Sequence, residues 1–187
     1  MMWFLRDRKA ASASINRSPR REFPVRGDAF RSISFGMTEK EYQFSMKRDK
    51  DVDADLSRSY PIFGYDMFGS EFIFNPKYMD GELFSITLIS EPYSGYSSQI
   101  RALFEAVLGM FIEKYGEPAQ LYKVTQRYAG SKVWDFGGKT IEVALVSSMK
   151  HGQSVAIEIT STAMIAAHDA LITSKNKEKF GKYSANF

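Results

Sequence analysis

Apolar side chains recur with helical spacing over residues 98–115. The positions follow the i, i+3, i+4, i+7 rule of a helix with one buried face. Gly116 ends the pattern, because glycine is a frequent helix C-cap, and Pro118 prevents the helix from resuming. We expect this face to pack on a sheet. The apolar positions are Ile100, Leu103, Phe104, Val107, Leu108, Phe111, Ile112 and Tyr115.

The opposite side of the same helix carries the small residues Ala102, Ala106 and Gly109. A helix with one apolar face and one face of small residues is often packed on both sides. We therefore expect the small residues to contact a second helix or a partner protein.

A shorter helix is predicted to begin after Thr38. Thr38 and Glu41 have the spacing of a capping box, in which each residue binds a free backbone amide of the other. The helix should continue to about Arg48. We expect a short strand before it, at residues 29–35, and a charged connection after it, at residues 49–61.

Alternation of apolar and polar residues predicts an antiparallel sheet. Residues 70–75 and 81–91 alternate, with an expected turn between them at Asn75-Pro76 and Asp80-Gly81. Four more antiparallel strands are expected within residues 120–160, and a last helix near Ser161 or Thr162. The expected turns in this region are Ala129-Gly130-Ser131, Gly137-Gly138 and His151-Gly152.

These patterns predict an α+β fold. An antiparallel sheet should pack against one long amphipathic helix, at 98–115, and one or two shorter helices. The expected organisation is a basic arm at residues 1–27, a single domain at 28–173 and a polar tail at 174–187.

Two triplets in the segment 133–143 look like nucleotide-binding motifs. Asp135-Phe136-Gly137 spells a kinase metal-binding triplet, and Gly138-Lys139-Thr140 spells the end of a phosphate-binding loop. A phosphate loop needs another glycine five positions before Gly138, where Val133 stands, and a helix after it, where a strand is predicted. We therefore expect a hairpin with a two-glycine turn, since glycine tolerates the positive φ that such turns require.

Charge is distributed unevenly along the 187 residues. The net charge is +3, yet residues 1–31 carry eight basic and three acidic residues (+5), and the remainder carries 17 basic and 19 acidic residues (−2). The body is therefore slightly acidic and the arm is basic. Within the arm, the candidate partner-binding residues are Arg17, Arg20, Arg21 and Arg26.

The arm is also compositionally similar to a mitochondrial transit peptide, which is rich in Arg and Ser and poor in acids. No secretory signal peptide is evident, and no apolar run approaches the length of a membrane span. A location in the cytoplasm or within a larger assembly is favoured, and the sequence leaves the compartment open.

Candidate chemical sites are few. The chain has no Cys, which excludes disulfides and thiolate chemistry. Asp51, Asp53 and Asp55 have the spacing of a calcium loop, but Leu56 stands where that loop needs glycine. The two histidines, at 151 and 168, have no ligand-spaced partner. We therefore predict no metal site, no cofactor and no catalytic residues, although two carboxylates distant in sequence could still meet in space.

Two tyrosines precede the 98–115 helix. Tyr93 and Tyr96 lie in a predicted loop, and loop tyrosines are frequent interface residues. They are candidate partner-binding residues, with capping of the core as the alternative.

The segment "ISFGMTEKEY" resembles the Gly-Met-Thr helix start of small outer-membrane assembly lipoproteins of the SmpA/BamE type and of the β-lactamase-inhibitor-protein fold. The resemblance covers about 15 residues, and it implies a capped helix before an antiparallel sheet, in a binding module. Those lipoproteins carry a lipid-bearing Cys that this chain lacks, so no residue roles are implied.

Three functions are compatible with the sequence. The first is a non-enzymatic protein-binding or assembly subunit that contacts another protein, or further copies of itself in a homo-oligomer, through the arm and the 98–115 helix. The second is nucleic-acid binding through the basic arm, at residues 1–31. The third is an enzyme with a spatially assembled carboxylate site. The absence of any coherent catalytic set favours the first.

Overall fold

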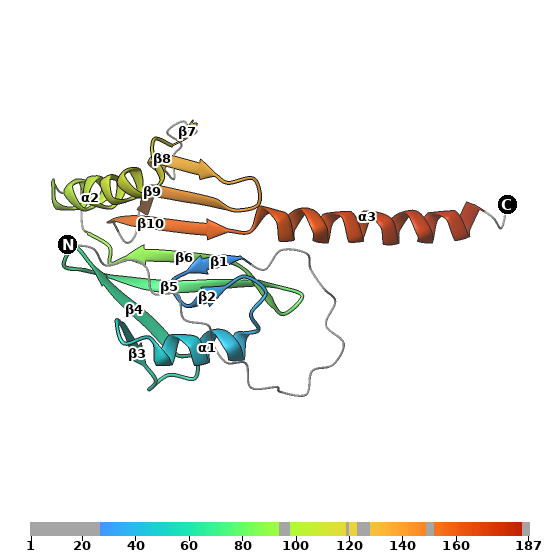
Figure 1. The fold of residues 1–187 in the computed structure, drawn as a ribbon, viewed down its shortest axis with the longest axis horizontal. Helices are drawn as coiled ribbons and strands as arrows, with labels where there is room; N and C mark the ends of the chain where they lie inside the picture. The colour runs from blue at the N-terminus through green and yellow to red at the C-terminus, as the bar shows by residue number, and fades with distance from the viewer. Residues whose placement is uncertain (1–26, 94–97, 119, 123–127, 149–151, 185–187) are drawn as a thin grey trace.

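The computed structural model describes residues 27–93, 98–118, 120–122, 128–148 and 152–184. Within these residues, an eight-stranded antiparallel sheet is combined with three helices and a two-stranded hairpin (Figure 1). The predicted α+β class is confirmed. No helix in the described part of the chain has the length and apolar character that a membrane crossing requires.

The first half of the chain forms a hairpin, a helix and four strands. Their bounds are β1 (Asp28–Phe30), β2 (Ile33–Ser34), α1 (Glu39–Arg48), β3 (Val52–Asp55), β4 (Ile62–Met67), β5 (Ser70–Met79) and β6 (Glu82–Ser90). The second half forms a helix, four strands and a final helix. Their bounds are α2 (Ser98–Tyr115), β7 (Gln120–Tyr122), β8 (Tyr128–Asp135), β9 (Thr140–Ser148), β10 (Gly152–Thr160) and α3 (Thr162–Ser184).

The strand order shows how the two halves join. It runs β3-β4-β5-β6-β10-β9-β8-β7, with every neighbouring pair antiparallel. Each half is thus a helix followed by four sequentially paired strands. The halves meet where their last strands, β6 and β10, pair with Ile157 opposite Leu88.

Both α1 and α2 lie on one face of this sheet, together with the β1–β2 hairpin. Tyr42 of α1 packs edge-on against Phe63, and Phe30 of the hairpin packs against Phe74, with ring centroids 5.8 Å apart in both pairs. Phe111 of α2 packs against Trp134, with centroids 5.7 Å apart. The register places the three sheet residues of these pairs on the same face.

The core lies between this face and the helices. Phe72, Leu88 and Ile157 have no exposed surface, and they come from three consecutive strands of the sheet, β5, β6 and β10. Along β5 the buried residues alternate with exposed ones, as the period of two predicted. Burying such side chains is the main favourable contribution to folding, at about 25 cal/mol for each Å² of apolar surface.

The helix predictions made from local signals are confirmed. Thr38 is the N-cap of α1, and its side chain accepts a hydrogen bond from the amide of Glu41 (3.4 Å) while Glu41 accepts one from the amide of Thr38 (2.9 Å). Residues 98–115 form α2, and Gly116 follows with φ +77°. The longest helix is, however, α3, which extends away from the sheet (Figure 1) and continues through residues 174–184.

Several strand predictions were wrong. The expected single strand 29–35 is the β1–β2 hairpin, which turns at Arg31 and Ser32. The expected charged connection contains β3, and β4 was not predicted. The expected turn at Ala129-Gly130-Ser131 lies inside β8, where the register with β9 shifts between Tyr128 and Gly130. The turn expected at His151-Gly152 includes residue 151, which lies outside the described residues.

The expected turn at Asn75-Pro76 also lies inside a strand. β5 continues through Pro76 to Met79, and only the Asp80-Gly81 turn is observed. β4 pairs with β5 only as far as Ile73, so Pro76 lies at an edge without a described neighbouring strand. Proline is tolerated at such a position because the hydrogen bond that it cannot donate has no partner there.

We predict that Thr38→Ala lowers the free energy of unfolding by about 1 kcal/mol, because it leaves an amide at the start of α1 without its capping partner. Urea denaturation followed by circular dichroism measures the change. Thr173→Ala, at an exposed position of α3, is the control and should change stability little. Equal effects of the two substitutions would contradict a stabilising role for the cap.

Candidate interaction surface

No described helix packs on the second face of the eight-stranded sheet, since α1, α2 and the hairpin share the other face and α3 extends away (Figure 1). We call this second face the open face. Its side chains follow the cross-strand register. One row runs from β3 to β8 through Asp53, Gly64, Ile73, Ile89, Ala156, Ala144 and Ser131.

The middle of this row is apolar. Ile73 and Ile89 are directly opposite each other on β5 and β6 and are 39% and 37% exposed. Beyond Ile89, Ala156 and Ala144 are small and buried, and beside Ile73 the side chain of Glu71 lies over Gly64. The two exposed isoleucines therefore form a small apolar area that is bordered on one side by a carboxylate.

A polar cluster lies next to the apolar row. Lys77 Nζ is 2.6 Å from Glu158 Oε1, and Ser85 Oγ donates a hydrogen bond to the same oxygen at 3.2 Å. Ser85 and Thr160 share a further hydrogen bond of 2.8 Å. The ion pair is partly exposed, so its net contribution to stability is at most about 1 kcal/mol.

Glu142 lies directly opposite Glu158 in the β9–β10 pair, and both side chains are half-buried. Like charges in directly opposed cross-strand positions repel. Lys77 forms a partly exposed ion pair with Glu158, whereas no described residue forms a hydrogen bond or ion pair with Glu142. Among the described residues, the charge of Glu142 is therefore not compensated.

The open face is acidic as a whole. Its charged strand residues include Lys77 and seven acids, which are Asp53, Asp55, Asp66, Glu71, Asp135, Glu142 and Glu158. Such a face attracts cationic groups and repels phosphate. Among the described residues, no group of three or more His, Cys, Asp or Glu side chains is placed to hold a metal ion.

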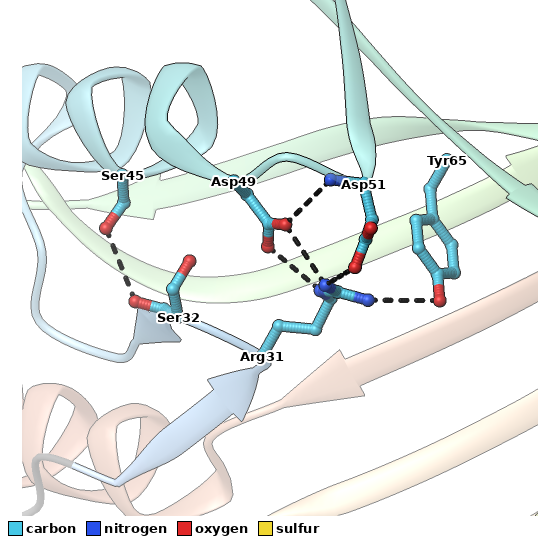
Figure 2. A network of polar contacts seen from close by, with 6 residues as sticks. All are labelled: Arg31, Ser32, Ser45, Asp49, Asp51 and Tyr65. Carbon is cyan, nitrogen blue, oxygen red and sulfur yellow. Dashed lines mark hydrogen bonds and ion pairs between the residues drawn. The ribbon is translucent and has the colours of Figure 1, made fainter. Parts of the chain in front are cut away.

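A second polar network joins the β1–β2 turn to the end of α1 (Figure 2). Arg31 donates to both carboxylate oxygens of Asp49 (2.9 and 3.0 Å), to Asp51, and to the hydroxyl of Tyr65 (3.1 Å). Burial acts to lower the pKa of Arg31, but the hydrogen bonds to Asp49 and Asp51 outweigh it and raise the pKa above its ordinary value. The guanidinium thus stays charged and fastens the hairpin to the helix.

This network uses part of the predicted calcium-loop spacing. Asp51 binds Arg31, while Asp53 and Asp55 lie on β3, and Asp55 accepts hydrogen bonds from Ser57. The segment is a strand and not a loop that wraps an ion. The aspartates are therefore distributed among separate structural contacts.

The hairpin predicted from the two-glycine turn is confirmed. The amide of Phe136 donates to the carbonyl of Lys139 (2.9 Å), and Gly137 has φ +76°. The amide of Gly137 donates to Asp135 Oδ1 (2.8 Å), and Lys139 Nζ donates to the carbonyl of Asp28 (3.2 Å). The residues of both nucleotide-like triplets thus stabilise a turn.

The predicted site residues have different outcomes. Tyr93 is half-buried; its backbone pairs with Gln153 in both directions, and its hydroxyl is 3.2 Å from Ser70 Oγ, so it closes the end of the sheet. Ala102 and Gly109 are exposed on α2 and Ala106 is half-buried. A side chain added at Gly109 would meet no atom within 4 Å. The remaining candidates, Arg17, Arg20, Arg21, Arg26 and Tyr96, lie outside the described residues.

Sequence reasoning missed the open face. The sequence does contain a sign of this face in the alternation of apolar and polar residues along the strands. Glu142 and Glu158 occupy polar positions of β9 and β10, and Thr87 occupies a polar position of β6. The pairing that brings these positions together became visible only in the strand order.

We predict that Arg31→Gly destabilises the protein less than Arg31→Ala, by about 1 kcal/mol. Both variants lose the network, but residue 31 has φ +53°, which costs an L-residue free energy and costs glycine little. Urea denaturation of the two variants measures the difference. An alanine variant as stable as the glycine variant would show that the backbone conformation carries no cost.

We also predict that Glu142→Gln raises the free energy of unfolding by about 0.2–1 kcal/mol, because it removes the repulsion with Glu158. The gain should shrink in 1 M NaCl, where charges are screened over about 3 Å. Asp53→Asn is the matched control, since Asp53 lies opposite Gly64 and not opposite an acid. A gain of the same size in the control would mean that local repulsion is not the cause.

Comparisons of the chain with protein-family models, with curated proteins and with solved structures gave no match.

Proposed function

We propose that the protein is a non-enzymatic protein-binding or assembly subunit, and that the open face of its sheet is the principal contact surface. The observation that supports this proposal is an eight-stranded sheet with both sheet-packed helices on one face and two exposed isoleucines in the middle of the other. Exposed apolar residues gathered on one surface and rimmed by polar groups are typical of interaction sites.

The chemistry of the open face selects among partners. The isoleucines favour an apolar segment, and the unneutralised Glu142 favours a basic residue beside it. Phosphate groups would meet the seven acids, so this face disfavours nucleic acid. The other hypotheses, nucleic-acid binding by the arm and an enzyme with paired carboxylates, stay predictions. Glu142 and Glu158 are two acids that the fold brings together, but Glu158 is held by Lys77 on an exposed sheet face.

The outward side of α2 is the second proposed contact surface. In this proposal α2 is the amphipathic helix of the fold, with Ile100, Val107 and Phe111 buried toward the sheet and Ala102 and Gly109 facing outward. Small outward residues allow the close approach of another backbone. The arm, residues 1–27, completes the proposed set of partner contacts.

The decisive substitution is Ile89→Arg, which places a charge in the middle of the open face. We predict that it abolishes capture of a protein partner from native extract, because the apolar contact is lost and an extra charge must be desolvated. Ile172→Arg on α3 is the matched control, since Ile172 is 44% exposed and receives the same substitution. Quantitative mass spectrometry of captured proteins, with and without nuclease, provides the measurement.

The outcomes separate the hypotheses. Capture that survives nuclease, persists in Ile172→Arg and is lost in Ile89→Arg supports the open face. If Ile89→Arg still captures the partner and Gly109→Arg does not, the contact surface is the outward side of α2 and not the open face. Capture that disappears with nuclease would favour nucleic-acid binding by the arm and refute the proposal. Thermal unfolding of each variant confirms that the fold is intact.

A further inference from the structure

We propose that α1 and the edge strand β3 form a cover that opens independently of the rest of the fold, and that the open state exposes the rings of Phe63 and Tyr78 and the backbone edge of β4. The cover lies in the first half of the chain. Its opening requires no binding partner, so the function proposed above is not assumed.

Few buried side chains hold the cover in place. Of residues 38–55, only Tyr42 and Met46 are buried, and both belong to α1. β3 is a short strand at the end of the sheet, and its four residues are exposed or half-buried. α2, the corresponding helix of the second half, buries five residues. Since local opening is favoured where few apolar side chains are buried, α1 is held less firmly than α2.

Two buried hydroxyls destabilise the closed state. The rings of Tyr42 on α1 and Tyr78 on β5 pack edge-on, with centroids 6.4 Å apart. Both hydroxyl oxygens are buried, and neither has a hydrogen-bond partner in the described part of the chain. A buried polar group without a partner loses its hydration without compensation. Opening returns both hydroxyls to water and thereby lowers the free-energy difference between the closed and open states.

Ionisation does not relieve this destabilisation. Burial raises the pKa of both tyrosines, and the charge of Glu39, in the first turn of α1, raises the pKa of Tyr78 further. Both hydroxyls therefore stay protonated at neutral pH, and the closed state keeps two donors without acceptors.

Polar contacts hold the two ends of α1. Before the helix, the amide of Leu83 on β6 donates to the carbonyl of Met37 at 2.8 Å, which fixes the point where the cover begins. After the helix, Asp49 and Asp51 accept hydrogen bonds from Arg31, and the side chain of Asp51 is exposed. Exposed ion pairs contribute little to stability, so the end after the helix is the one that is released more easily.

Opening uncovers a surface that the closed state lacks. Tyr42 packs edge-on against Phe63 of β4 as well as against Tyr78, so both rings lose their cover when α1 leaves. β3 pairs with β4 at four positions, among them Ala54 opposite Phe63, and its departure frees that edge of β4. A free strand edge beside apolar rings is a template for pairing with another extended chain.

Native-state hydrogen exchange of the full-length protein, followed by NMR, tests the cover. Relative to their intrinsic rates, we expect the amides of α1 and β3 to exchange about 100-fold faster than the amides of α2. Equal protection of α1 and α2 would show that no separate opening occurs.

A substitution in α2 separates local opening from global unfolding. Val107 has no exposed surface, so Val107→Ala destabilises the folded chain. The amides of α2 should then lose protection about tenfold, whereas those of α1 keep theirs, because opening of the cover leaves residue 107 buried. A loss of equal size in both helices would mean that the fold is one cooperative unit and would overturn the proposal.

A matched pair of substitutions tests the role of the hydroxyls. Tyr42→Phe removes a buried hydroxyl without a partner and should raise the protection of the α1 amides about tenfold. Tyr65→Phe is the control, because it removes a hydroxyl that accepts a hydrogen bond from Arg31 (3.1 Å), and it should not raise protection. Unchanged or lower protection in Tyr42→Phe would show that this hydroxyl is satisfied in solution and would refute the destabilisation on which the opening depends.

Discussion

The pairing of β6 with β10 is the interaction on which the rest of the structure depends. It joins two units, each a helix followed by four strands, into one sheet. Its register, with Ile157 opposite Leu88, aligns the buried side chains of both units on one face and therefore places α1 and α2 on the same side. A shift of one residue would turn Glu158 toward the core and Ile157 toward solvent, so burial of the isoleucine row fixes the register strongly.

The same register creates the open face. Side chains alternate between the two faces of each strand. When the apolar residues of β6, β10 and β9 align on the covered face, the polar residues between them must align on the open face, which sets Glu142 opposite Glu158. Repulsion between them costs about 0.2–1 kcal/mol, which is small beside the burial of three strands but not negligible for a protein of marginal stability. In the function proposed above, this pair of acids beside two exposed isoleucines would favour a partner that is both basic and apolar.

The sequence predicted what depends on near neighbours along the chain. The cap at Thr38, the C-cap at Gly116 and the turn at Gly137 follow from two to five residues each, and they are confirmed. β3 was missed because Asp53 and Asp55 disfavour a strand by propensity, and the cross-strand pairing with β4 overrides them. The open face was missed because it requires knowing that β6 pairs with β10, more than 60 residues away.

The uneven distribution of charge along the chain changes how the net charge of the molecule should be understood. A net charge of +3 suggests a weakly basic protein, yet residues 1–26 carry +5, and the strands of the open face carry seven acids and Lys77. The local potential at a surface is set by the charges near that surface, so the open face is acidic although the chain as a whole is basic. In the function proposed above, the acidity of this face and not the net charge of the chain would therefore select the partner.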